Sequence, residues 1–269
     1  MKFTVFGSSG FIGSNLLKYL ETKDFEVFFP NIRKQNVFDD SLGHVIYAIG
    51  VPNFLEEPFN TVDAHVCILK KILEKGKFES LLYLSSSRIY YGANITGEEE
   101  PIRVNPSKLN DLYNISKIMG ESICMTAKCD NVRIVRPSNV TGNNFNSNLF
   151  LPSIIRDAIE KNKIILHTTL ESEKDYILVN DLISILPEIS LNAKQKIYNV
   201  ARGQNTKTEE IVDEISRITG CEVEVEQNAK NYSFPIISTQ RIKNEFNFNP
   251  KSIIPELEKI ISNYKKFRN

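Results

Sequence analysis

The sequence predicts an α/β protein, a doubly wound parallel sheet with a small α/β lobe formed by the C-terminal part of the chain. Short apolar runs alternate with segments of helical periodicity through the first half of the 269 residues. A glycine-rich turn joins the first apolar run to the first helical segment. After Pro137 the alternation loosens, and Asn139–Asn148 has the composition of a loop. Alternating strands and helices build a parallel sheet that helices cover on both faces.

Each element of the first half rests on its own pattern. Short apolar or β-branched runs predict strands, and apolar residues spaced three and four apart predict helices. The expected strands are Lys2–Phe6, Phe25–Phe29, Val45–Ile49, Leu81–Leu84 and Val132–Val135. One helix is expected to begin at Phe11, and two more are expected to cover Asn60–Glu74 and Asn110–Lys128. The segment from Pro30 to Gly43 is too short for a full crossover, so we expect no helix there.

The second half contains fewer strands and ends in helices. We expect helices at Leu149–Glu160, from Asp181 onward, at Thr208–Thr219 and at about Ile253–Phe267. Strands are expected at Tyr176–Val179 and Ile197–Val200. Gly220 follows the Thr208–Thr219 helix directly, as expected for a helix that ends in a left-handed residue.

Composition narrows the class of protein. The chain carries 33 basic and 33 acidic residues, so no global charge favours nucleic acid or an anionic membrane. No apolar run reaches the ~18 residues of a membrane span, and no secretory signal is evident. The four cysteines lack C-x-x-C spacing and are expected to be reduced, which favours the cytoplasm. The histidines His44, His65 and His167 are dispersed, so we expect no metal site.

The glycine-rich turn predicts a dinucleotide site. Gly7 allows a tight turn, Gly10 lets the backbone approach a pyrophosphate, and Gly13 lets the helix pack closely. The N–H groups at the start of the helix favour the phosphates. We therefore expect cofactor contacts from the turn and the first helical residues, namely Gly7, Ser9, Gly10, Phe11, Ile12 and Gly13. The alternative is a generic Gly/Ser turn between a strand and a helix.

The residues after the second strand bear on the choice of cofactor. An acid at that position would bind the ribose of NAD, but this chain has Arg33 and Lys34. Arg33 could bind a 2′-phosphate, so NADP is favoured over NAD. The alternative is that both bases are solvated loop charges.

A tyrosine and a lysine form the second motif. Tyr113 and Lys117 share one face of a helix because they lie four residues apart. A nearby cation lowers the pKa of a phenol, so Tyr113 could exchange a proton with a sugar hydroxyl during hydride transfer. Ser87 ends a run of three serines after the fourth strand, at the sheet edge where ligands bind.

Together these residues resemble the extended short-chain dehydrogenase/reductase superfamily, in its NAD-dependent epimerase/dehydratase (nucleotide-sugar) branch. The segments that carry the resemblance, beyond the glycine turn and Tyr113-x-x-x-Lys117, are Leu84-Ser85-Ser86-Ser87-Arg88-Ile89-Tyr90-Tyr91-Gly92, Arg136-Pro137-Ser138-Asn139-Val140-Thr141-Gly142, Lys174-Asp175-Tyr176-Ile177-Leu178-Val179-Asn180-Asp181 and Tyr198-Asn199-Val200-Ala201-Arg202-Gly203. The resemblance implies a Rossmann-like fold and a catalytic set of Tyr113, Lys117 and Ser87, with Ser87 aligned on Tyr91-Gly92. It further implies cofactor contacts at Tyr113, Lys117 and Pro137, and substrate contacts at Ser87, Asn139 and Lys174.

Three departures from the family pattern narrow the reaction. Arg88 and Ile89 stand where dehydratases carry an acid pair, so 4,6-dehydration is not expected. Lys174 replaces an arginine that pairs with substrate phosphate, leaving a point charge in place of a bidentate contact. His65 replaces an asparagine, and a buried, hydrogen-bonded role is expected for it.

The resulting hypothesis is an NAD(P)-dependent oxidoreductase acting on a nucleotide-activated sugar, by 4-keto reduction. The alternatives are a 4-epimerase with tightly bound NAD and, more remotely, a non-catalytic dinucleotide-sensing protein. Residues 1–138 and about 168–200 are expected to bind the dinucleotide, and about 139–167 and 201–269 to bind the substrate. Relatives pair the tyrosine-bearing helix with its neighbour across a two-fold axis, so a homodimer is expected.

Overall fold

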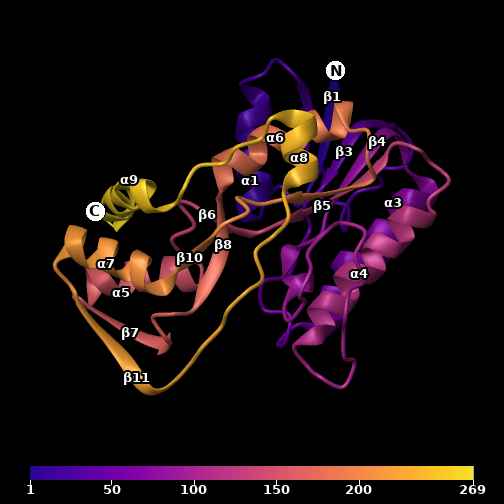
Figure 1. The fold of residues 1–269 in the computed structure, drawn as a ribbon. Coiled ribbons are helices and arrows are strands. Elements are labelled where there is room, and N and C mark those ends of the chain that lie inside the picture. Colours follow the sequence, from indigo (N-terminus) through magenta and orange to yellow (C-terminus); the bar gives the residue numbers. More distant parts are fainter. Residues whose placement is uncertain (269) are drawn as a thin grey trace.

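The computed structural model describes residues 1–268 and shows a parallel sheet beside a smaller lobe (Figure 1). The sheet has six strands in the order β2-β1-β3-β4-β5-β9, and every neighbouring pair is parallel. Its strands are β1 (Lys2–Phe6), β2 (Glu26–Phe28), β3 (Ser41–Tyr47), β4 (Lys77–Leu84), β5 (Val132–Pro137) and β9 (Ile197–Val200). The predicted doubly wound α/β fold is therefore confirmed.

Helices cover both faces of this sheet. On one face, α1 (Phe11–Glu21) and α6 (Val179–Asn192) share an apolar core with β1, which includes Phe3, Leu16 and Leu182. On the other, α3 (Ile68–Lys75) and α4 (Asp111–Thr126) pack on a separate core. Buried apolar residues on both sides of the strands are what a parallel sheet between two helical layers requires.

The connection between β2 and β3 contains no helix, as predicted. Residues 29–40 run from β2 to β3 as turns and bends. Val37 is buried in the same core as Leu42 and Leu69, so one side chain of this loop fills apolar space on the helical face. This shortened edge of the sheet contains Arg33, the residue proposed from the sequence to select the cofactor.

The smaller lobe has its own sheets and its own core. Strands β6 (Asn139–Thr141), β8 (Glu173–Leu178) and β10 (Asn205–Lys207) form a sheet in the order β10-β8-β6. Strand β7 (Lys163–Thr168) pairs in parallel with β11 (Glu222–Lys230). Helices α5 (Phe150–Glu160), α7 (Thr208–Thr219) and α9 (Leu257–Arg268) share a second apolar core. These elements lie together in the left half of Figure 1.

Several predicted boundaries are corrected by the structure. The expected loop at Asn139–Asn148 begins with β6, and the strand expected to reach Ile49 ends at Tyr47. The single helix expected at Asn60–Glu74 is α2 (Pro58–Val62), a π-helical turn (Asp63–Cys67) and α3. The helix expected from Asp181 begins two residues earlier, at Val179. Gly220 does close α7 in a left-handed conformation with φ 76°.

A buried ion pair joins β5 to α4. The Arg136 guanidinium donates to both carboxylate oxygens of Glu121, Nε to Oε1 at 3.0 Å and Nη2 to Oε2 at 2.6 Å. Arg136 is 3% exposed and Glu121 5%. Arg136 Nη1 also donates to the Glu98 carbonyl and to the Tyr90 hydroxyl. The helix that carries Tyr113 is thereby fixed to the sheet by charge as well as by apolar contact.

Among residues 1–268, no helix is both long enough and apolar enough to cross a membrane.

Candidate active site

The sequence-predicted site residues gather at the carboxyl ends of the central strands. Gly7 directly follows β1, Ser85 to Ser87 follow β4, and Asn139 begins β6 directly after β5 and Ser138. Helix α4 packs alongside β4 and β5 and presents Tyr113 at the same edge. This edge is where open parallel sheets bind ligands.

The glycine turn has the geometry that a dinucleotide needs. Gly7 adopts φ 91°, and a Cβ on Gly13 would lie 2.1 Å from the Gly7 carbonyl oxygen, so the predicted close approach is observed. A Cβ on Gly10 would meet only that same oxygen, at 3.4 Å, which leaves its outer side open. Helix α1 has no side-chain cap and no acid in its first turn. Its free N–H groups and positive dipole end therefore fit a pyrophosphate.

Tyr113 lies half-buried, and Ser86 is a serine that influences the pKa of its phenol. Burial raises the pKa of Tyr113, while a side-chain hydrogen bond with Ser86 and the charge of Arg88 act in the opposite direction. Ser86 caps the 3₁₀ turn that begins at Ser87, and its Oγ also accepts from the Arg88 backbone N–H at 3.2 Å. Ser87 itself is 5% exposed. The net rise corrects our expectation of a lowered pKa at Tyr113 before ligands bind.

Lys117 is buried one turn along α4, as the spacing predicted. Its Nζ donates to the Leu84 carbonyl at 2.8 Å and lies 5.9 Å from the centre of the Tyr113 ring. Burial lowers the pKa of Lys117 to about 7, although Glu121 acts to raise it. The lysine is thus held at the end of β4, and part of the population is neutral near pH 7.

Arg88 also belongs to the site. In the sequence it is notable only because a dehydratase would carry an acid at this position. Its guanidinium carbon lies 4.7 Å from the centre of the Phe54 ring and 5.2 Å from that of Tyr113. The Phe54 and Tyr113 rings are themselves 5.5 Å apart. No spacing rule links Phe54, Arg88 and Tyr113, because three separate segments bring them together.

His65 has the buried, hydrogen-bonded position expected from the sequence. It is fully buried in the π-helical turn, and its Nδ1 and Ser116 Oγ are 2.8 Å apart. Its ring meets the Tyr113 ring edge-on, with centres 5.2 Å apart. Burial, with a smaller contribution from Lys117, lowers the pKa of His65 to about 2. His65 is therefore neutral in the folded protein and supports α4 behind the tyrosine.

This neutral histidine predicts a loss of stability in mild acid. The unfolded chain protonates His65 near pH 6.5, whereas the folded protein does so only near pH 2. The free energy of unfolding should fall as pH drops below about 6.5, by at most about 1.4 kcal/mol per pH unit from this group. Urea unfolding at pH 7.5 and pH 5.0 should show a smaller difference for His65→Asn than for wild type. Equal differences would contradict this assignment.

The remaining predicted residues lie at the rim of the site. Asn139 is exposed, and its Nδ2 donates to the Asp175 carbonyl at 2.8 Å. Pro137 is buried at the end of β5. Lys174 is half-buried, with its Nζ 5.7 Å from the Phe150 ring centre and 5.8 Å from that of Phe234. Both lobes thus contribute residues that could contact a substrate.

Arg33 lies in the connection between β2 and β3, in a different segment from Tyr113. It is exposed and forms an ion pair with Asp63 at 3.4 Å. Exposure leaves the guanidinium free to exchange this partner for a stronger one, such as a phosphate.

The sequence comparison assigns the chain to a family. Residues 3–201 match the model of the NAD dependent epimerase/dehydratase family. The chain belongs to this family. A GDP-6-deoxy-D-talose 4-dehydrogenase from Aggregatibacter actinomycetemcomitans is 28% identical over 248 residues, 85% of this chain and 83% of the relative. A GDP-6-deoxy-D-mannose reductase from Pseudomonas aeruginosa is 25% identical over 252 residues, 83% of this chain and 82% of the relative.

The fold of this epimerase/dehydratase family member matches solved structures over its full length. The structure of RMD from Pseudomonas aeruginosa, complexed with NADPH, superimposes with a TM-score of 0.82 at 21% identity. That match covers 98% of this chain and 99% of the other. The prediction of an NAD(P)-dependent enzyme of the epimerase/dehydratase family is confirmed by the family match.

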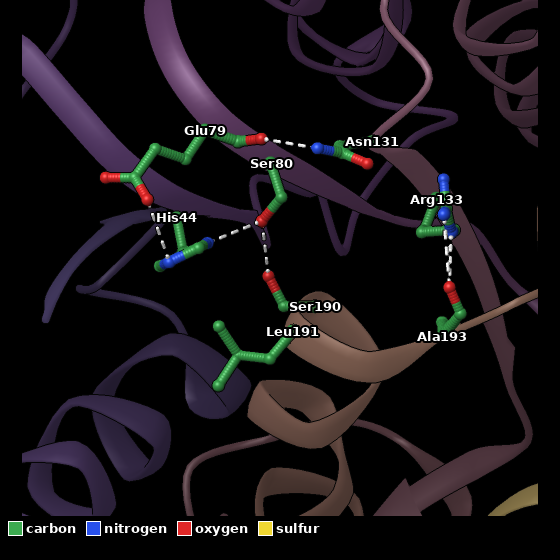
Figure 2. A pocket seen from close by; sticks show the side chains of 8 residues that line it. All are labelled: His44, Glu79, Ser80, Asn131, Arg133, Ser190, Leu191 and Ala193. Atoms are coloured by element: carbon green, nitrogen blue, oxygen red, sulfur yellow. Dashed lines mark hydrogen bonds and ion pairs between the residues drawn. The ribbon is translucent and has the colours of Figure 1, made fainter.

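A small polar cavity of this family member lies away from the site. It measures about 150 Å³ and is shown in Figure 2. Within it His44 Nδ1 meets Ser80 Oγ at 2.9 Å, Ser80 meets Ser190 at 3.0 Å, and Arg133 donates to the Ala193 carbonyl. These groups satisfy one another. Because β5 begins here, the cavity lies at the amino-terminal edge of the sheet, opposite the edge that carries Tyr113. The hydrogen bonds among its lining residues leave no reason to propose a ligand site there.

Proposed function

We propose that this protein reduces the 4-keto group of a nucleotide-activated deoxysugar, using NADPH as the reductant and Tyr113 as the proton donor. The observation that carries the proposal is the set of groups around the Tyr113 ring, which are Phe54, His65, Ser86 and Arg88. Within residues 1–268, none of these ring contacts is a carboxylate. Elimination of water needs a carboxyl acid, whereas ketone reduction needs one proton donor and one hydride. Both curated relatives carry names of enzymes that oxidise or reduce GDP-deoxysugars.

Each residue of the site would have its own role in the reduction. When bound, NADPH supplies the hydride that adds to the carbonyl carbon. Tyr113 donates its phenolic proton to the carbonyl oxygen, which becomes the hydroxyl of the product. Ser87, with Ser86 beside it, would hydrogen-bond the same oxygen, and the Lys117 ammonium would bind a cofactor ribose. Asn139 and Lys174 would bind the substrate from the lobe side.

The preference for NADPH should depend on Arg33. In the structure, Arg33 is exposed on the shortened sheet edge, and no acid follows β2 directly. A hydrogen bond to a charged phosphate is worth about 1.5–3 kcal/mol, so Arg33→Ala should raise the KM for NADPH about tenfold or more. Activity with NADH should change little. Lys34→Ala is the matched control, and an equal loss with both cofactors in Arg33→Ala would contradict the role.

The cofactor released from purified protein tests the reaction type. A reductase exchanges its cofactor at each turnover, so mass spectrometry of denatured protein should find substoichiometric NADP(H). Stoichiometric, tightly held NAD, together with no net NADPH consumption, would identify a 4-epimerase and overturn the proposed reduction.

The arrangement of binding regions and the assembly complete the proposal. Residues 1–138 and about 168–200 would hold the dinucleotide, and about 139–167 and 201–269 the substrate. Support comes from α6 and β9, which pack with the main sheet, and from α5, α7 and α9, which share the lobe core. Two parts of the chain do not follow these bounds: β8, within 168–200, pairs with β6 and β10 of the lobe, and Ile242, within 201–269, lies in the core of the main sheet. Apolar Phe59 and Met119 are exposed on α2 and α4, at 88% and 50%, and a homodimer through these helices would cover them. Light scattering should then give twice 30.7 kDa. The four free thiols favour a reducing compartment such as the cytoplasm.

A further inference from the structure

We infer that Arg88 is a positioning residue that holds a permanent positive charge against the Tyr113 ring and stabilises its phenolate form. The inference rests on the proposed role of Tyr113 in proton transfer. It assigns to Arg88 an effect that the sequence spacing predicts for Lys117.

The geometry places the guanidinium in contact with the tyrosine. Arg88 follows Ser87 in the 3₁₀ turn after β4, and its guanidinium carbon is 5.2 Å from the Tyr113 ring centre. Phe54 packs against both groups, at 4.7 Å from Arg88 and 5.5 Å from Tyr113. Contact with two rings restricts where the guanidinium can lie, so its charge stays beside the phenol.

The charge of Arg88 is not neutralised within residues 1–268. Its guanidinium makes no ion pair or hydrogen bond there, although Asp111 lies near enough to influence it. Lys174 on β8 lies near enough to be affected by this charge: burial lowers the pKa of Lys174, and Arg88 lowers it further. An unpaired, half-buried cation interacts strongly with any anion that forms next to it.

Arg88 and Lys117 differ in how firmly their charge is held. Lys117 donates to the Leu84 carbonyl, and burial lowers its pKa to about 7. Burial also lowers the pKa of Arg88, but a guanidinium stays protonated throughout the range in which enzymes work. The other titratable groups that face Tyr113 are His65 from the π-helical turn and Tyr83 from β4. Both are neutral near pH 7. Arg88 is therefore the group beside the Tyr113 ring that keeps its positive charge throughout this pH range.

Fluorine NMR on protein that contains 3-fluorotyrosine tests this without substrate or cofactor. The fluorinated phenol is more acidic than tyrosine, and comparison with Tyr113→Phe assigns one of the ten tyrosine signals. We expect ionisation of residue 113 to move to higher pH by about one unit or more in Arg88→Met. Arg88→Lys, which keeps the charge, should stay nearer wild type. The exposed Arg217→Met on α7 is the matched control and should titrate as wild type does.

Two results would overturn the inference. One is an Arg88→Met protein whose residue-113 signal has the wild-type chemical shift at every pH from 6 to 11. The other is an equal displacement in Arg88→Met and Arg88→Lys, which would show an effect of packing and not of charge. Neither result depends on turnover, so the proposed reduction could stand if Arg88 failed this test, and the titration could succeed if the substrate were different.

Discussion

Replacing Tyr113 with phenylalanine is expected to lower kcat for ketone reduction by about 10²–10⁴-fold. The variant keeps the ring that packs against Phe54 and His65 and loses only the hydroxyl that donates the proton. Most of the predicted substrate and cofactor contacts come from other residues, so KM should change little. Steady-state rates of NADPH consumption with a 4-keto nucleotide sugar give both constants.

Tyr19→Phe provides the matched control for this loss. Tyr19 lies on α1, at the face packed on the main core, and its hydroxyl makes no hydrogen bond within residues 1–268. That variant should turn over at the wild-type rate. Full turnover by Tyr113→Phe would remove Tyr113 from the reaction.

Breaking the ion pair between Arg136 and Glu121 is expected to have the largest effect on stability. Arg136→Met should lower the free energy of unfolding by about 3–5 kcal/mol, because it leaves the Glu121 carboxylate buried without its partner. The Glu98 carbonyl and the Tyr90 hydroxyl also lose a donor. Urea unfolding followed by circular dichroism measures the loss.

Two comparisons isolate the buried charge as the cause. The double variant Arg136→Met/Glu121→Gln removes both charges and should regain part of the stability. Arg217→Met breaks an exposed pair with Glu214 on α7 and should cost less than about 1 kcal/mol. A double variant less stable than Arg136→Met would contradict the electrostatic explanation.

The parts of the site that could be predicted from sequence are those fixed by local spacing. Gly7, Gly10 and Gly13 lie within one strand–helix turn, and Tyr113 and Lys117 within one helical turn. Their relative positions follow from backbone geometry alone. The order of these motifs along the chain then placed both at the same sheet edge.

Contacts between distant segments could not be predicted in this way. Phe54 and Arg88 reach Tyr113 from two different loops, so no spacing in the sequence relates them. Alignment on Tyr91-Gly92 selected Ser87, and in the structure the neighbouring Ser86 caps the 3₁₀ turn and influences the pKa of the Tyr113 phenol. Which serine bonds the substrate stays a prediction.

The strands of the fold also differ in whether they could be predicted from the sequence. The inner strands of the main sheet are largely buried apolar runs and were predicted, whereas β11 was not. Its sequence begins Glu222-Val-Glu-Val-Glu, and most of its residues are exposed, so the apolar signal is weak. Pairing with β7 alone defines it as a strand.

The transfer of isotope from cofactor to product tests the central claim most directly. The enzyme should be supplied with a 4-keto nucleotide sugar and NADPH deuterated at the reactive nicotinamide carbon. The account predicts one deuterium at C4 of the product sugar for each NADPH consumed, as read by NMR and mass spectrometry. Sugar product without deuterium, or turnover without loss of NADPH, would contradict it.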